Sequence, residues 1–137
     1  MVVWRQRTDN DWLYRAQTIV EGFVERPEEA DEPTCGPGPF SMANADTTTD
    51  VLTHAGFSDI TLHRCDIPIL IGTDVDEAID LVMSLGPAGE LLRLAGESAA
   101  HLHGEVDAAL RAGLTEFAQP DGTLVAPAST WIVSAVA

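Results

Sequence analysis

Apolar and polar positions alternate along the chain with two different periods. Several stretches repeat an apolar residue every three or four positions, which is the pattern of a helix with one buried side. The first such stretch has five apolar residues on one helical face: Trp12, Ala16, Ile19, Val20 and Phe23. Asp9, Asn10 and Asp11 lie just before it and are residue types that cap helix N-termini. The sequence therefore predicts a helix that begins near residue 11.

A second helix is predicted by its start and stop signals. Either Asn44 or Asp46 can cap its first turn, and Gly56 suits the left-handed position that follows many helices. Further along, Thr73 and Asp76 have the spacing of a capping box, which marks the start of a third helix. These signals place helix boundaries near residues 45, 55 and 74.

The third helix is expected to end at Gly86-Pro87, because proline cannot continue it. Helical spacing resumes from about Pro87 to Leu94. It returns once more in a set of apolar residues three or four positions apart: Leu102, Val106, Ala109, Leu110, Leu114 and Phe117. The second half of the chain is thus predicted to contain three consecutive helical pieces.

Three segments have the composition of strands. The first is Val2 to Arg5, the second is Ile60 to Ile71, and the third is Trp131 to Val136. The second begins with alternation and becomes continuously apolar from Ile67, so we expect its later half to be buried on both faces.

The order of these elements predicts an α/β fold in which four to five helices pack on a small, three-stranded mixed sheet. At 137 residues, we expect a single domain, 1–137. Within it, 1–24 forms a strand and a helix, 25–43 an acidic, Pro- and Gly-rich linker or lid, and 44–137 a C-terminal subdomain.

The charge balance narrows the choice of partners. The net charge is −15, from 22 acidic and 7 basic residues, which repels nucleic acid and anionic lipid. The apolar runs are too short to span a bilayer or to act as a secretion signal, so we expect a cytoplasmic protein without membrane or nucleic-acid partners.

Few residues have the spacing of a metal or catalytic site. Cys35 and Cys65 have no second pair and are expected to be reduced structural thiols. His63 and Cys65 share one face of a strand, where packing is the favoured interpretation. His101 and His103 point to different faces of a helix and favour a surface role. The acidic run, formed by Glu28, Glu29, Asp31 and Glu32, favours a solvated loop over a cation site.

Several motifs, taken in order, resemble the C-terminal portion of small-molecule class I SAM-dependent methyltransferases. They are Trp4-Arg5 with Asn10 and Trp12, Gly38-Pro39-Phe40, Ala55-Gly56-Phe57, Asp66-Ile67-Pro68, Asp74-Val75-Asp76-Glu77-Ala78, Leu85-Gly86-Pro87, and Trp131, Val133 and Ala135 in the last strand. Each motif alone is weak, and their order and spacing carry the resemblance over nearly the whole chain.

The resemblance implies that the three strands correspond to strands five, six and seven of that fold. Their order in the sheet would be 5-7-6, with the last strand antiparallel and between the others. The glycine-rich turn that would bind SAM is missing, because Gly36-Pro37-Gly38-Pro39 contains two prolines without amide hydrogens. SAM is the family's cofactor, but we expect no cofactor, no catalytic residue and no activity for this chain alone.

Two functions from different classes follow. In the first, the chain supplies the acceptor-substrate wall of a methyltransferase, with Trp4, Arg5, Trp12 and Phe40 as contacts, while another polypeptide binds SAM. In the second, it is a stand-alone homodimeric interaction protein that pairs through the strand edge Val2 to Arg5. Binding of a small apolar ligand in the vacated space is a further alternative.

Overall fold

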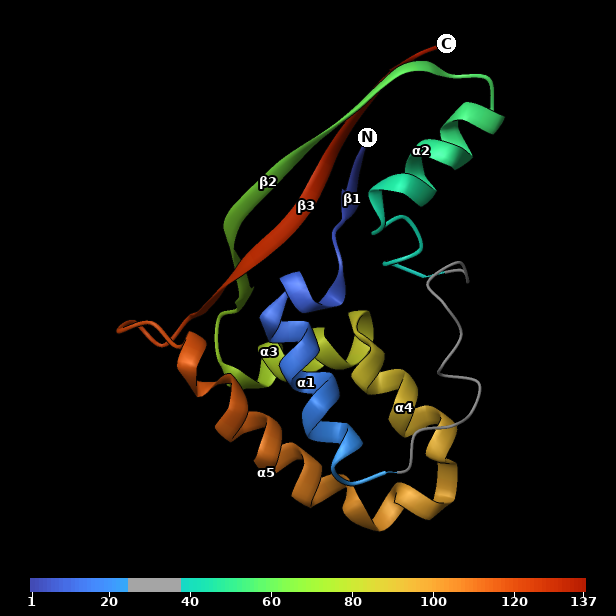
Figure 1. Ribbon diagram of the computed structural model, residues 1–137. Helices are drawn as coiled ribbons and strands as arrows, with labels where there is room; N and C mark the ends of the chain where they lie inside the picture. The colour runs from blue at the N-terminus through green and yellow to red at the C-terminus, as the bar shows by residue number, and fades with distance from the viewer. Residues whose placement is uncertain (25–37) are drawn as a thin grey trace. The chain divides into compact units, whose positions relative to one another are not determined.

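The computed structural model describes residues 1–24 and 38–137, and Figure 1 shows the course of the chain through them. Eleven elements follow one another in this part of the chain: β1 (Val2–Trp4), η1 (Arg7–Asp9), α1 (Asp11–Glu21), α2 (Ala45–His54), β2 (Ser58–Gly72), α3 (Val75–Leu85), α4 (Pro87–Ala95), η3 (Gly96–Leu102), α5 (His103–Leu114), η4 (Thr115–Phe117) and β3 (Leu124–Val136). The fold is α/β, with a three-stranded sheet and five α-helices, as the sequence predicted. Most of the predicted 25–43 linker lies outside the described residues.

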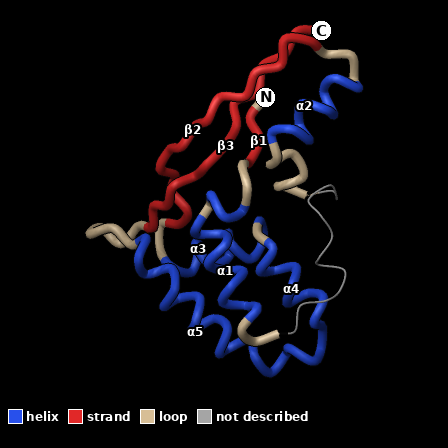
Figure 2. The backbone as a smooth tube through the Cα atoms, in the orientation of Figure 1, coloured by secondary structure: helices blue, strands red, loops and turns tan. Residues whose placement is uncertain are grey.

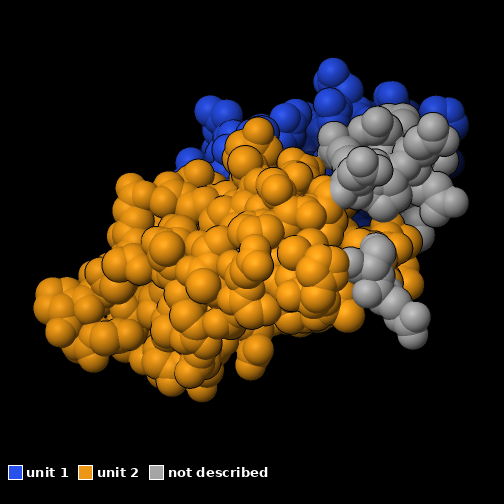
Figure 3. Space-filling model, turned by 90° about the horizontal axis from the view of Figure 1, so that it is seen from below, with its two compact units in different colours: residues 1–10, 32–67, 128–137 blue, residues 11–31, 68–127 orange. Residues whose placement is uncertain are grey.

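The described residues form two compact units, coloured separately in Figure 3. The first unit contains residues 1–10, 38–67 and 128–137, and the second contains 11–24 and 68–127. Figure 2 shows that strands make up much of the first unit and helices most of the second. Both β2 and β3 run from one unit into the other.

In the first unit, the strands lie in the order β1-β3-β2, so the last strand of the chain is central. β1 runs antiparallel to β3, with Val2 opposite Ile132. Hydrogen bonds join Ser58 of β2 to Val136 of β3, and Thr61 of β2 to Ser134 of β3. Later residues of β2 thus lie beside earlier residues of β3, so these two strands run in opposite directions. Both neighbouring pairs are therefore antiparallel, and the prediction of a mixed sheet is corrected. The two outer strands do not pair with each other.

The predicted burial of β2 is also corrected. The sequence predicted that its apolar second half would be buried on both faces, but Ile67 is 51% exposed and Leu70 is 56% exposed. Only Ile71 and Gly72, at its end, are buried. The reason is topological: β2 is an outer strand with one neighbour, so an apolar run does not imply cover on both faces.

Local signals decide where the helices begin. Asn44 caps α2, because its side-chain oxygen accepts hydrogen bonds from the amides of Asp46 and Thr47 at 2.9 and 3.0 Å. Gly56 follows with φ of 92°, the left-handed conformation that the sequence predicted.

The capping box of α3 is formed by residues one position further along than predicted. Asp74 is the cap and accepts from the amide of Glu77 at 3.0 Å. The Glu77 carboxylate in turn accepts from both the amide and the hydroxyl of Thr73. Thr73 therefore precedes the cap, and Asp76 lies inside the first turn.

The core of the second unit is apolar and formed by four helices. α1 packs against α4 and α5, and α3 packs against the same two helices. The side chains at the centre of these contacts are almost completely buried: Trp12, Leu13, Val20, Val82, Leu110 and Leu114. Gly113 of α5 allows close approach to α1, because an added Cβ would lie 2.4 Å from Cδ1 of Ile19. Helical periodicity thus accounts for this unit.

Candidate functional site

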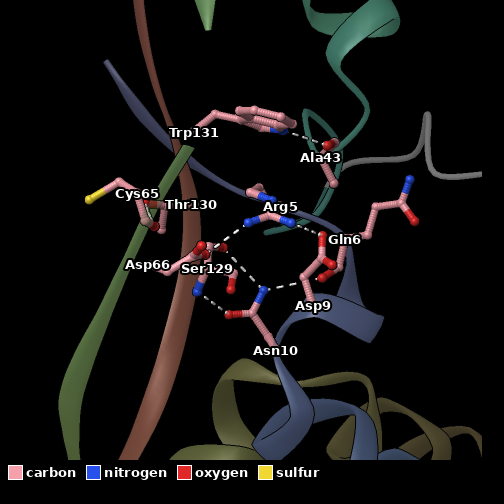
Figure 4. Close-up of polar contacts among 10 residues, drawn as sticks. All are labelled: Arg5, Gln6, Asp9, Asn10, Ala43, Cys65, Asp66, Ser129, Thr130 and Trp131. Atoms are coloured by element: carbon pink, nitrogen blue, oxygen red, sulfur yellow. Dashed lines mark hydrogen bonds and ion pairs between the residues drawn. The ribbon is translucent and has the colours of Figure 1, made fainter. Parts of the chain in front are cut away.

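The first unit has a buried arginine at its centre, drawn in Figure 4. Arg5 directly follows β1 and is 4% exposed. Its Nη1 donates to Oδ1 of Asp66 on β2 at 2.8 Å, and its Nη2 lies 2.9 Å from Oδ2 of Asp9. The short helix η1 brings Asp9 back toward the strand four residues after Arg5. The guanidinium therefore joins β1, η1 and β2.

Trp131, at the centre of β3, lies between two arginines. The guanidinium carbon of Arg5 is 5.3 Å from its ring centroid, and that of Arg64 is 6.0 Å away. These arginines come from the strand segments on either side of β3, so the indole is flanked by cations from both neighbours. Its Nε1 donates to the carbonyl of Ala43 at 2.9 Å, which ties the segment before α2 to the sheet.

Asn10 completes the polar cluster and is completely buried. Its Oδ1 accepts from the amide of Ser129 at 2.8 Å, and its Nδ2 donates to the carbonyls of Ser129 and Gln6, both at 3.2 Å. A side-chain amide that bonds both backbone groups of one residue acts in place of a neighbouring strand. Asn10 thus extends the pairing of β3 beyond the end of β1.

The four predicted acceptor contacts have different surroundings. The rings of Trp4 and Phe40 lie 6.4 Å apart at a tilt of 47°, so the structure brings this pair together in the first unit. Arg5 follows Trp4 directly and lies in the polar cluster described above. Trp12 belongs to the helical core of the second unit and has no exposed surface.

The bonding of Arg5 limits what this cluster can do chemically. Both terminal nitrogens have carboxylate partners, while its buried Nε has no hydrogen-bond acceptor among the described residues. An anionic ligand would have to displace Asp9 or Asp66, both of which are partly exposed. The arrangement is suited to holding three segments together and to offering one N–H donor, and it contains no nucleophile with an adjacent base.

The remaining candidate residues do not assemble into a site within residues 1–24 and 38–137. His63 is exposed and Cys65 is a half-buried free thiol. His101 and His103 are both exposed. No group of three metal-ligating side chains occurs in this part of the chain. Cys35 and the acidic run Glu28, Glu29, Asp31 and Glu32 lie outside the described residues.

Sequence reasoning missed three members of the cluster: Asp9 as an ion-pair partner, Asp66, and Ser129. One signal was available, since Asp66 is a charged residue beside an apolar strand segment, and such a residue commonly has a partner. Its partner could not be found from sequence, because Arg5 is 61 residues away.

Comparison of the sequence with protein-family models and with curated proteins gives no match. Among the described residues, no helix combines the length and apolar character needed to cross a bilayer.

Proposed function

We propose that this chain is a methyltransferase-like C-terminal fragment that contributes a wall of the acceptor-substrate site, while SAM binds to a second polypeptide. The main support for the proposal is the position of β3 in the sheet. It is the last strand of the chain, yet it lies between β1 and β2 and runs antiparallel to both. The resemblance implies this relative order for strands five, seven and six.

The position of the helices gives further support. α2 lies between β1 and β2 in the sequence, and α3, α4 and α5 all lie between β2 and β3. Small-molecule methyltransferases of the kind that the sequence resembles have a helical insertion before their last strand. The strand order and the placement of the helices are the two features that support the proposal.

The wall itself would be formed near the end of β1. Ligands of open α/β sheets bind at the carboxyl ends of strands, where this chain has Trp4 and Arg5. Trp4 and Phe40 offer aromatic surface for an acceptor, and the buried Arg5 holds the strand end in place. Trp12, the fourth predicted contact, is the least suited because its side chain is completely buried.

The proposal also explains why the chain would be inactive alone. SAM binding in this fold depends on backbone amides in a glycine-rich turn between a strand and a helix. The only closely spaced glycines with that appearance, Gly36 and Gly38, each precede a proline. Methyl transfer depends on holding donor and acceptor in line, so without a donor site the rate enhancement is lost.

The test is calorimetric titration of SAM into the purified chain, alone and together with the product of any coding sequence directly upstream. We expect no binding to the chain alone, and binding when a polypeptide with the glycine-rich turn is present. Micromolar binding of SAM by this chain unaided would overturn the proposal. So would a complete complex whose SAM affinity and acceptor methylation are unchanged when Trp4→Ala and Phe40→Ala are combined.

A further inference from the structure

We draw no further inference here: the strongest candidate, the side-chain cluster of Arg64 on β2 and Trp131 on β3 beside the buried Nε of Arg5, carries nothing, because Arg5 belongs to the site already described and nothing in the described part of the chain shows a ligand or partner on the exposed Arg64.

Discussion

Different kinds of interaction stabilise the interiors of the two units. In the second unit, four helices bury apolar side chains such as Leu110, Leu114 and Val82 against one another. In the first unit, the buried set includes Arg5, Asn10, Thr48 and Ser129, and these polar groups are bonded to backbone or to carboxylates. The helical unit should therefore respond to lost volume, and the sheet unit to lost hydrogen bonds.

The largest effect is expected from emptying the helical core. Leu114 has no exposed surface, so Leu114→Ala should lower the free energy of unfolding by about 3 kcal/mol through lost burial and a residual cavity. Urea denaturation measures the loss, and hydrogen exchange read peptide by peptide locates it. Leu94→Ala is the control, since Leu94 is 37% exposed and should cost well under half as much. Equal costs for the two variants would contradict an apolar core centred on α5.

A somewhat smaller effect is expected from removing the polar link in the sheet unit. Asn10→Ala deletes three hydrogen bonds and leaves the buried amide of Ser129 without its acceptor, while the carbonyl of Ser129 still accepts from the amide of Arg5 at 3.0 Å. We expect a loss of about 2 kcal/mol, mostly from the unsatisfied amide.

The control for that variant is Asn44→Ala, which removes an exposed helix cap. Its expected cost is about 1 kcal/mol, because water can replace the cap. Protection of β3 amides near Ser129 should fall only in Asn10→Ala. If Asn10→Ala cost no more than Asn44→Ala, the first unit would not depend on this buried amide in the way described.

The smallest expected effect concerns the capping box of α3. Hydrogen bonds from the hydroxyl and amide of Thr73 lower the pKa of the Glu77 carboxyl below its ordinary value. The stabilisation is therefore fully present above about pH 4.3, the pKa of a free glutamate, and is lost as pH falls through the lowered value. Glu77→Gln should remove this pH dependence. The measurement is the unfolding midpoint of the wild type and of this variant between pH 3 and pH 7. If the midpoints of both proteins changed with pH to the same extent, the prediction would be wrong.

Local sequence rules predicted the helical unit better than the sheet unit. The proline at the start of α4 and the apolar stripes of α1 and α5 are signals carried by residues within a few positions of one another. The helical stretch that was predicted from about Pro87 to Leu94 agrees with α4 to within one residue. Helix geometry depends on such short-range contacts, so the sequence expresses it directly.

The sheet unit could be predicted only in outline. β3 begins at Leu124, seven positions before the predicted start at Trp131. The sequence did not reveal its first half, because that half contains Pro127 and has no clear alternation of apolar and polar residues. The ion pair of Arg5 with Asp66 and the bonds of Asn10 to Ser129 join residues 61 and 119 positions apart. No local pattern specifies which distant group will be the partner. The candidate site therefore needed the fold before its members could be recognised.

The sequence of β2 has a consequence for colloidal behaviour. This strand has fifteen residues and only β3 as its neighbour among the described strands, so it presents a long side along which fibrils could grow. Pro68 cannot donate a backbone hydrogen bond, and the charged side chains of Arg64 and Asp66 precede it. These residues oppose amyloid-like stacking along the strand, so the same element can tolerate apolar positions without making the protein prone to precipitate.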